Sequence, residues 1–290
     1  MMLALREAIR AATATLAEAG IDSARTDAEQ LAAHAAGVDR GRLTFLDPSA
    51  DFLDRYDELI TARSRRIPLQ HLTGTAAFGP LQLNVGPGVF IPRPETESLL
   101  QWAITEVERL GLVEPPRIVD LCTGSGALAI ALARQWPDAT VVAVDDSAAA
   151  LGYARCNGAG TAIRFIEADI TVDGLHPEFD GDIDLIVANP PYIPDGAQLE
   201  PEVAEHDPPH ALFGGPDGMA VISSVVARAV CWLRPGGRLA VEHDDSTSGR
   251  TVELITQTGC FTDVVARRDL TGRPRFVTAI RVPGPEGGAR

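Results

Sequence analysis

Residues 118–126 read IVDLCTGSG, a short apolar run that leads directly into a glycine-rich turn. The apolar run predicts a buried strand, and the alanine- and leucine-rich residues 127–134 predict a helix after the turn. Glycines in such a turn let the backbone bend sharply and let a ligand approach the main chain. A strand, a glycine turn and a helix in this order are typical of the ligand-binding edge of an α/β sheet.

Toward the C-terminus the sequence alternates between strand and helix patterns. Apolar runs that predict strands occupy residues 118–121, 141–145, 163–166, 183–188, 237–242, 261–267 and 275–282. Helical patterns lie between several of these runs, and one of them covers residues 219–233. This alternation predicts an α/β fold with a doubly wound parallel sheet, and the last two runs predict two further strands, seven in all.

Residues 1–66 instead carry the periodicity of amphipathic helices. Apolar residues recur every three or four positions up to Gly20, then up to Gly37, and again between residues 51 and 66. Glycines at the ends of the first two stretches are typical helix terminators. These patterns predict a small N-terminal helical bundle, and no ligand-binding motif lies within it.

Residues 67–92 differ from the sequence on either side. Glycine and proline interrupt short alternating runs such as residues 81–85, which predicts a linker that contains a β-hairpin. We therefore expect a helical domain over residues 1–66, this linker, and an α/β domain over residues 93–282. Residues 283–290 are rich in glycine and proline and predict a disordered tail.

The composition excludes several kinds of chemistry. The 290-residue chain has a net charge of −15, and all 25 of its basic residues are arginine. Without lysine there is no Schiff-base lysine, no phosphate-loop lysine and no lysine general base. The acidic balance argues against broad nucleic-acid binding, which needs cations that neutralise phosphates. Residues 165–227 contain 13 acidic residues and no arginine, so we expect an acidic wall there that repels nucleic acid.

The four cysteines lie far apart and form no C-x-x-C pair, so neither a disulfide framework nor a zinc site is expected. No apolar stretch approaches the roughly 20 residues of a membrane span, and charged residues interrupt the N-terminal region where a signal peptide is apolar. His206 and His210 resemble a metal-ligand pair, but Pro208 and Pro209 break any helix between them. We expect a monomeric cytoplasmic protein without a bound metal or a membrane partner.

The glycine loop by itself is compatible with two cofactors. Residues 124–129 also fit the G-x-G-x-x-A fingerprint of dinucleotide-binding proteins. Asp145 ends the next predicted strand, 19 residues after Gly126, where a carboxylate accepts hydrogen bonds from ribose hydroxyls. This segment therefore leaves a nicotinamide enzyme and an S-adenosylmethionine (SAM) enzyme equally open.

The sequence Asn189-Pro190-Pro191-Tyr192 decides between them. It follows the fourth predicted strand, at the carboxyl edge where ligands of open α/β sheets bind. The two prolines remove two backbone donors, which leaves the Asn189 side-chain oxygen and the Pro190 carbonyl as acceptors. Such an edge suits a planar –NH2 group, whose hydrogens it holds while the nitrogen faces a methyl donor. Tyr192 is expected to wall the site and pack on a flat group.

With these two motifs the sequence resembles the release-factor glutamine methyltransferases, the HemK/PrmC family. The resemblance extends to further segments: PLQHLTG at 68–74, FIPRPETE at 90–97, ALFGGPDG at 211–218 and DLTGRPR at 269–275. It implies a seven-stranded SAM-dependent methyltransferase sheet and an N-terminal helical domain that docks the substrate. It also implies that a methyl group passes from SAM to the side-chain amide nitrogen (N5) of the glutamine in the Gly-Gly-Gln motif of peptide-chain release factors, leaving S-adenosylhomocysteine.

The resemblance assigns expected roles to individual residues and implies no metal. The residues expected to hold SAM are Asp120, Cys122, Thr123, Gly124, Ser125, Gly126, Asp145, Asp169, Ile170 and Asn189. The residues expected to contact the substrate are Asn189, Pro190, Pro191, Tyr192, Arg93 and Glu95. The catalytic residues among them are Asn189, Pro190 and Tyr192.

Two residues depart from the family's pattern. Cys122 stands where the family usually has glycine, so we expect no positive φ at this position. Ile170 stands where an aromatic residue sometimes stacks on the adenine, so only apolar packing is expected there. Residues 242–245, Glu-His-Asp-Asp, are expected to be a solvated strand end. The roughly 25 residues between Ile193 and Gly218 are long for an α/β loop and predict a lid.

Three other functions share some of these features. A nucleic-acid amino methyltransferase, acting on adenine N6 or guanine N2, shares Asn-Pro-Pro-Tyr and is the main alternative. It should show a basic groove or an added nucleic-acid-binding module. A nicotinamide oxidoreductase shares the glycine loop but leaves Asn-Pro-Pro-Tyr unexplained. A non-catalytic module on the same scaffold is expected to have lost one motif, and none is lost.

Overall fold

The chain divides into two units, and the computed structural model describes residues 2–45 and 48–283. The smaller unit combines Met1–Thr75, Val85–Pro87 and Leu199–His206, and the larger unit combines Ala76–Asn84, Gly88–Gln198 and Asp207–Arg290. The predicted tail, apart from Pro283, lies outside the described residues. Within the described part of the chain, no helix is both long and apolar enough to cross a membrane.

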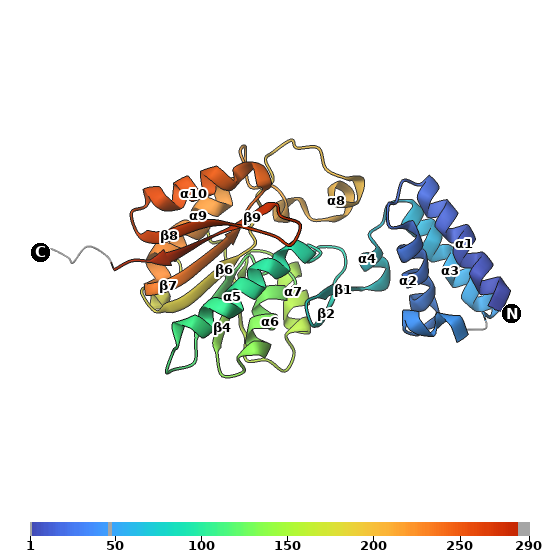
Figure 1. Ribbon diagram of the computed structural model, residues 1–290, viewed down its shortest axis with the longest axis horizontal. Coiled ribbons are helices and arrows are strands. Elements are labelled where there is room, and N and C mark those ends of the chain that lie inside the picture. The colour runs from blue at the N-terminus through green and yellow to red at the C-terminus, as the bar shows by residue number, and fades with distance from the viewer. Residues whose placement is uncertain (1, 46–47, 284–290) are drawn as a thin grey trace, which may run out of the picture. The chain divides into compact units, whose positions relative to one another are not determined.

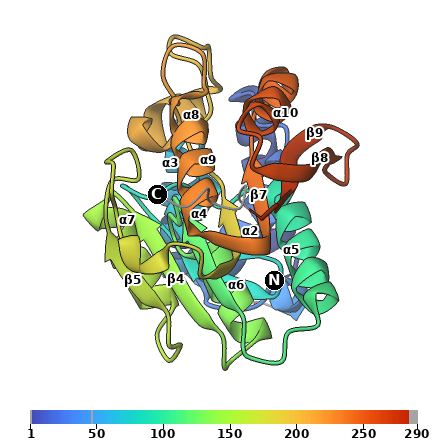
Figure 2. The same ribbon diagram turned by 90° about the vertical axis from the view of Figure 1, so that its left-hand side faces the viewer.

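The larger unit is built on a seven-stranded sheet (Figure 2). Its strands are β3 (Arg117–Leu121), β4 (Thr140–Asp145), β5 (Arg164–Glu167), β6 (Ile183–Ala188), β7 (Leu233–Glu242), β8 (Phe261–Arg268) and β9 (Pro274–Arg281). Their order is β5-β4-β3-β6-β7-β9-β8, so β5 lies at one edge and β8 at the other. The predicted α/β fold and its seven strands are confirmed.

The sheet is mixed, with the predicted parallel strands followed by two strands that form an antiparallel pair. Strands β3 to β7 pair in parallel, whereas β9 runs antiparallel to both β7 and β8. The connection between β8 and β9 is a short turn, and a parallel crossover needs roughly a dozen residues or more. A hairpin is therefore the only connection that the chain allows between these two strands.

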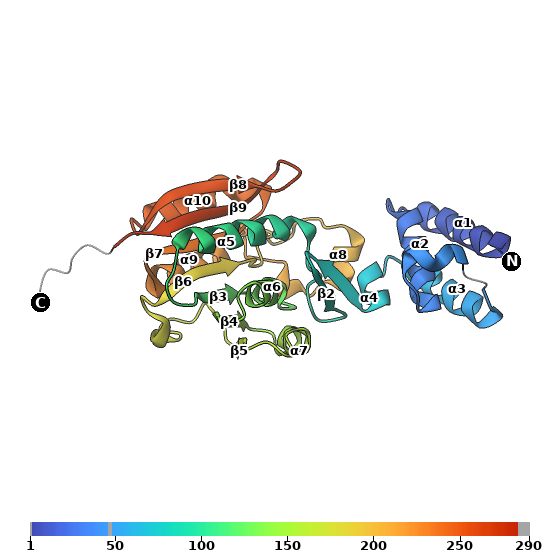
Figure 3. The same ribbon diagram turned by 60° about the horizontal axis from the view of Figure 1, so that its bottom comes forward.

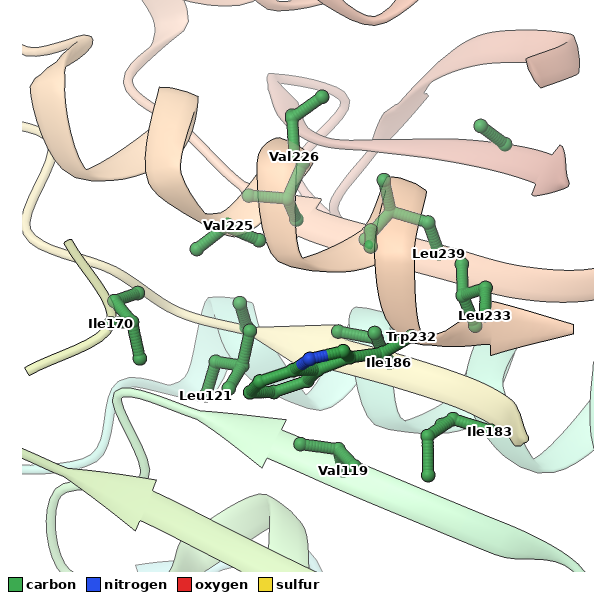
Figure 4. Close-up of a cluster of buried hydrophobic side chains, with 14 of the residues drawn as sticks. Val119, Leu121, Ile170, Ile183, Ile186, Val225, Val226, Trp232, Leu233 and Leu239 are labelled. Atoms are coloured by element: carbon green, nitrogen blue, oxygen red, sulfur yellow. The ribbon is translucent and has the colours of Figure 1, made fainter. Parts of the chain in front are cut away.

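Helices cover both faces of this sheet (Figure 3). They are α5 (Glu97–Leu110), α6 (Ala127–Gln135), α7 (Ala148–Asn157), α9 (Ala220–Trp232) and α10 (Ser248–Gln257). Short 3-10 turns are η2 (Pro94–Thr96), η3 (Pro177–Phe179), η4 (Pro209–Ala211) and η5 (Asp245–Thr247). Residues of α9 and α10 pack on one face, and Figure 4 shows Val225 of α9 and Leu121 of β3 within that cluster. Residues of α5 and α6, such as Leu99 and Leu132, pack on the opposite face.

The predicted β-hairpin consists of β1 (Thr75–Phe78) and β2 (Leu81–Asn84). Phe78, Leu81 and Leu83 are buried and join the apolar cluster that contains α5 and α6. Because their alternating side chains are buried on one face, the hairpin is part of the larger unit's core. It precedes η2 and α5, which carry residues of the site described below.

The carboxyl ends of four parallel strands meet at one edge of the sheet. Leu121, the last residue of β3, pairs with Val144 of β4 and with Ala188 of β6. Ala188 in turn pairs with Val241 of β7. The glycine loop, the end of β4, the Asn-Pro-Pro-Tyr motif and the end of β7 are therefore neighbours at this edge.

The smaller unit is helical, as predicted for the N-terminal region (Figure 1). It contains α1 (Met2–Glu18), α2 (Ala24–Ala36), η1 (Arg40–Phe45), α3 (Ala50–Ser64), α4 (Leu69–Thr73) and α8 (Pro201–His206). Leu16, Leu31 and Phe52 form its core together with Tyr56, whose hydroxyl donates to the Ala28 carbonyl at 2.9 Å. The amphipathic periodicity of the first three helices explains this core, because each buries one apolar stripe.

Helix α8 comes from the chain between β6 and α9, yet it belongs to the smaller unit. Arg63 of α3 is buried and pairs with the buried Asp27 of α2 at 2.7 Å and with Glu202 of α8 at 3.0 Å. Arg66 also pairs with Glu202, at 3.2 Å. Part of the segment predicted as a lid is therefore a helix that ion pairs attach to the smaller unit.

Candidate active site at the carboxyl edge of the sheet

A pocket opens at this edge of the larger unit. Most of the residues predicted for the site line it: Asp120, Cys122, Thr123, Gly124, Ser125, Asp145, Asp169, Ile170, Asn189, Pro190, Pro191 and Tyr192. Gly126, Arg93 and Glu95 do not line it. The structure thus brings the glycine loop and the Asn-Pro-Pro-Tyr motif, more than 60 residues apart in the chain, to one cavity.

The glycine loop joins β3 to α6 through a series of left-handed residues. The φ angles are 59° at Cys122, 56° at Gly124 and 85° at Gly126. A Cβ on Gly126 would lie 2.8 Å from the Cδ1 atom of Ile130 and 3.3 Å from the Cβ atom of Ala154. A side chain at Gly126 would therefore be strained by the positive φ and would force the end of the Ile130 side chain to move.

The expectation of no positive φ at Cys122 is wrong. The N–H of Thr123, the next residue, donates to the Val144 carbonyl of β4 at 3.0 Å, which fixes the direction in which the loop leaves β3. A left-handed non-glycine residue costs about 1–3 kcal/mol, and the surrounding structure imposes that cost here. The Cys122 side chain packs against the apolar cluster beneath α9. Burial and the neighbouring aspartates raise the pKa of the Cys122 thiol, so it remains protonated.

Asp120 lies beneath the loop and is almost completely buried. Its Oδ2 accepts hydrogen bonds from the Thr123 hydroxyl at 2.6 Å and from the Ala129 N–H at 3.1 Å. Its Oδ1 is buried and has no partner among the described residues. Burial raises the pKa of Asp120 to about 7, although the two hydrogen bonds lower it. Asp120 thus braces the loop with one oxygen and leaves the other available beside the pocket.

Two further carboxylates line the pocket after β4 and β5. Asp145 accepts a hydrogen bond from the Gly124 N–H at 2.8 Å, and burial raises the pKa of this carboxyl. Asp169 is exposed, and hydrogen bonds from the Thr171 hydroxyl and N–H lower its pKa. Ile170, which directly follows Asp169, is buried and gives the pocket an apolar wall.

Asn189, directly after β6, is held by a side chain from a distant segment. Its Nδ2 donates to the Oγ1 atom of Thr96 at 3.2 Å. Thr96 ends η2 and is buried, and its own hydroxyl donates to Glu242 at 2.8 Å. The Oδ1 atom of Asn189 accepts no hydrogen bond from the described residues, while the side chain lines the pocket. It is therefore a free acceptor at the pocket wall.

The expectation that residues 242–245 form a solvated strand end is wrong for Glu242 and His243, which are 1% and 0% exposed. Glu242 accepts hydrogen bonds from the hydroxyls of Thr96, at 2.8 Å, and of Tyr192, at 3.0 Å. Burial raises the pKa of Glu242 to about 7, and the two hydroxyls lower it. Burial and the charge of Glu242 also raise the pKa of Tyr192, so its phenol remains protonated.

The backbone of Pro191 and Tyr192 is packed tightly against two glycines. A Cβ on Gly214 would lie 2.5 Å from the Pro191 carbonyl oxygen, and a Cβ on Gly218 would lie 2.2 Å from that of Tyr192. The Gly214 N–H also donates to the Ile193 carbonyl at 2.9 Å. The segment after η4 therefore fixes the backbone of the Asn-Pro-Pro-Tyr motif, and the two ends of the predicted lid are packed together.

Arg93 and Glu95 lie outside the pocket but influence its walls. The Arg93 guanidinium stacks over the Phe90 ring, 4.8 Å from its centroid, and pairs with the buried Asp207. Since Phe90 lines the pocket, Arg93 acts on the pocket through this ring. The negative charge of Glu95 raises the pKa of Glu242.

Sequence reasoning missed several residues of the pocket wall, among them Phe90, Thr96 and His210. The available signal for the first two was the segment 90–97, which resembles the family. It missed Glu242 because a run of charged residues after a strand resembles solvated surface. The burial of Glu242 depends on hydroxyl partners that lie 50 and 146 residues away in the chain.

Many acidic residues of the segment 165–227, the predicted acidic wall, form ion pairs with arginines outside that segment. The acids of this segment that form such ion pairs are Asp173, Glu178, Asp182, Asp184, Glu200, Glu202, Asp207 and Asp217. Among the described residues, the acids that line the pocket are Asp169 of this segment and Asp120, Asp145 and Asp146 from outside it. No arginine is among the described residues that line it.

Comparison with known proteins finds matches to two family models and to relatives that align with almost the whole chain. Residues 7–74 match the PrmC N-terminal domain, and residues 106–206 match the methyltransferase small domain. A release factor glutamine methyltransferase of Mycolicibacterium smegmatis is 65% identical over 282 residues, which are 97% of this chain and 99% of that protein. Those of Mycobacterium tuberculosis and Streptomyces coelicolor are 61% and 47% identical over 96% of this chain and 92% and 98% of theirs.

Proposed function

The chain belongs to the family of release factor glutamine methyltransferases, and from this membership we propose that it methylates a peptide-chain release factor in the cytoplasm. The methyl group passes from SAM to the side-chain amide nitrogen, N5, of the glutamine in the Gly-Gly-Gln motif. The reaction forms a nitrogen–carbon bond, breaks a sulfur–carbon bond and releases one proton from the amide nitrogen. The products are N5-methylglutamine and S-adenosylhomocysteine.

One observation above all supports the choice of an amide as the acceptor. The Nδ2 atom of Asn189 donates to Thr96, so its Oδ1 atom is the free polar atom of a side chain that lines the pocket. The Pro190 carbonyl is next to it, and neither Pro190 nor Pro191 has an N–H. The motif thus has two acceptors at this point, and its two prolines add no backbone donor. This arrangement complements the two hydrogens of a primary amide.

The residues of the pocket fit SAM, which carries a positive sulfonium and an ammonium group. Four aspartates line the pocket, and the Oδ1 atom of Asp120 is buried without a partner among the described residues. We propose that the glycine loop and Asp120 hold the methionine part of SAM. Asp145 accepts hydrogen bonds from the ribose hydroxyls of SAM, and Asp169 and Ile170 lie beside its adenine. When bound, SAM supplies a methyl group on a positively charged sulfur, and this chemistry needs no metal ion.

The residues of the Asn-Pro-Pro-Tyr motif would then prepare the substrate amide. Asn189 Oδ1 and the Pro190 carbonyl each accept one amide hydrogen, which orients the nitrogen toward the methyl donor. As the nitrogen becomes positively charged, the same two acceptors stabilise that charge. Pro191 and Tyr192 line the path of the glutamine side chain. No strong base is required, because the amide proton leaves after methyl transfer.

We further propose that residues 1–66 dock the release factor, residues 67–92 link the domains, and residues 93–282 carry the reaction. Support comes from the match of residues 7–74 to a family domain that is separate from the methyltransferase domain. Arg93 and Glu95 then act on the substrate site indirectly, since neither lines the pocket.

The function is tested by incubating the purified protein with methyl-tritiated SAM and a purified release factor. We expect label in the release factor with Gly-Gly-Gln and none in its Gly-Gly-Ala variant, with N5-methylglutamine identified by mass spectrometry. Duplex DNA and ribosomal RNA serve as competing acceptors, and label in either in place of the release factor would contradict the proposal. Asn189→Ala should lower turnover by about 100-fold or more while SAM binding, measured by calorimetry, is largely retained.

A further inference from the structure

A buried carboxyl group lies behind the Asn-Pro-Pro-Tyr motif and has no part in the reaction described above. Glu242 is the last residue of β7, and the pairing of Val241 with Ala188 places it level with Asn189, which directly follows the neighbouring parallel strand β6. Its side chain is 1% exposed. Burying a carboxyl group is costly unless hydrogen bonds compensate for the lost water. Glu242 therefore depends on hydrogen-bond partners to remain buried.

The partners of Glu242 connect it to both ends of the motif. Its Oε2 accepts from the Thr96 hydroxyl at 2.8 Å, and its Oε1 accepts from the Tyr192 hydroxyl at 3.0 Å. The same Thr96 oxygen accepts from the Nδ2 atom of Asn189 at 3.2 Å. One carboxyl group thus contacts Tyr192 directly and Asn189 through a single hydroxyl.

The direction of these hydrogen bonds decides which atom Asn189 presents to the pocket. A hydroxyl has one proton, and in Thr96 that proton is directed to Glu242. Thr96 can then only accept from Asn189, which places Nδ2 at Thr96 and leaves Oδ1 free. Without Glu242, Thr96 could donate to Asn189 instead, and the Asn189 amide could turn by 180°. Its NH2 group would then face the NH2 group of the substrate, and two donors repel each other.

We propose that Glu242 is a positioning residue for the methyl transfer, which orients the Asn189 amide through Thr96 and holds the Tyr192 hydroxyl. The proposal rests on the proposed function, because it concerns the acceptor that receives the substrate amide. In its ionised form Glu242 only accepts hydrogen bonds, so both hydroxyls must donate to it. In its protonated form one oxygen becomes a donor, and the direction of the network is no longer fixed.

The charges around Glu242 set the pH at which this change occurs. The pKa of Glu242 is raised to about 7, chiefly by burial and in small part by the charge of Glu95 from η2. The hydroxyls of Thr96 and Tyr192 and the positive charge of Arg275 from β9 favour the ionised form. On its own strand end His243 is buried as well. We therefore expect kcat to rise with pH through an ionisation near 7.

Two variants test the hydrogen-bonded connection from Glu242 through Thr96 to Asn189. Glu242→Gln keeps the shape of the side chain but replaces one acceptor with a donor, so one hydroxyl must reverse. Thr96→Val removes the hydroxyl that connects Glu242 to Asn189. Each should lower kcat for the release factor by roughly 10- to 100-fold, while the Kd for SAM changes by less than about threefold. Because both act through one connection, the double variant should lose little more than either single variant.

Two further variants separate positioning from stability. Thr96→Ser restores the hydroxyl and should keep kcat within about threefold of the wild type, since the hydrogen bonds are retained. Asp184→Asn is the matched control. Asp184 is a buried carboxylate at the opposite end of β6, where it accepts from the Arg117 N–H at 2.8 Å and pairs with Arg234. Its substitution should lower stability without changing kcat or the pH profile.

The pH profile of kcat is measured for every folded variant. In Glu242→Gln the rise near pH 7 should disappear, and a profile and kcat equal to those of the wild type would overturn the proposal. A loss of activity in Glu242→Gln that is fully explained by a smaller amount of folded protein, with kcat per folded molecule unchanged as expected for Asp184→Asn, would also overturn it. If Glu242→Gln does not fold, a fully active Thr96→Val overturns it instead. Absence of transfer by the wild type contradicts the proposed function, whereas normal transfer by all variants contradicts only the role of Glu242.

Discussion

A Cβ atom on Gly218 would lie 2.2 Å from the carbonyl oxygen of Tyr192, far inside van der Waals contact. Gly218 also has a φ of 74°, which disfavours any side chain. We expect Gly218→Ala to displace the Tyr192 backbone and with it the Pro190 carbonyl. A displacement of about 1 Å at a reacting site costs roughly 100-fold in rate. Kinetics with a release factor should show this loss in kcat, with the affinity for SAM nearly unchanged.

Gly174→Ala is the control for this variant. Gly174 has a similar φ of 70°, but no atom of the described residues lies within 4 Å of a Cβ at that position. This variant therefore carries the backbone cost alone, about 1–2 kcal/mol of stability, and should keep its activity. Equal losses of activity in both variants would show that the contact with Tyr192 is not the cause.

The fold was predictable because its signals are local. Each strand of the sheet is a run of apolar residues, such as residues 118–121 or 183–188, and each run lies between turn or helix patterns. The pocket followed from the same reasoning, since parallel strands end at one edge and two motifs directly follow strands. These inferences need no knowledge of contacts between distant residues.

What could not be predicted depends on such distant contacts. Glu242 is buried because Thr96 and Tyr192 supply hydroxyls from other segments, and no pattern around residue 242 indicates them. The short helix α8 belongs to the smaller unit because Glu202 meets arginines of α3 and its C-terminal turn. Local counts of acidic residues fail for the same reason, since their arginine partners lie elsewhere in the chain.

Cys122 provides a second prediction, concerning stability. It has a φ of 59° in a loop where glycine would carry no penalty. Cys122→Gly removes this strain and the packing of the thiol, whereas Cys122→Ala removes the thiol but keeps the strain. We therefore expect the glycine variant to be more stable than the alanine variant by about 1 kcal/mol. Urea denaturation of the two variants measures the difference, and a more stable alanine variant would show that the loop relaxes.

Asp120 provides a prediction about pH. Its pKa is raised by burial to about 7 in the folded protein, compared with about 3.9 for an unfolded aspartate. Between these values the folded state binds more protons than the unfolded state. The contribution of Asp120 to the free energy of unfolding is therefore fully present below about pH 4 and is lost as pH rises through 7.

The free energy of unfolding of the wild type should accordingly fall relative to that of Asp120→Asn as pH rises from about 4 to 7. The relative change should be a few kcal/mol and should level off above about pH 8, since one pKa unit corresponds to about 1.4 kcal/mol. Urea denaturation at several pH values measures both proteins. A difference that stays constant over this range would mean that Asp120 keeps its ordinary pKa.

The last prediction concerns the buried ion pair of the smaller unit. Arg63 and Asp27 are each 3% exposed and lie 2.7 Å apart. Asp27→Ala leaves the Arg63 charge buried, with Glu202 as its one remaining acidic partner among the described residues. Breaking a buried pair costs about 3–5 kcal/mol. If residues 1–66 dock the release factor, this variant should raise KM for the intact release factor but leave transfer to a short Gly-Gly-Gln peptide unchanged.

The contrast between the two substrates separates docking from catalysis. Transfer to the peptide depends only on the pocket of the larger unit. Asp27 belongs to the smaller unit and does not line that pocket. Asp22→Ala, a substitution of an exposed acid in the same unit, is the matched control and should behave like the wild type with both substrates. A variant Asp27→Ala that retains its KM for the release factor, although calorimetry shows the smaller unit unfolded, would rule out docking by residues 1–66. A parallel loss with peptide and release factor would instead show that the smaller unit supports the pocket itself.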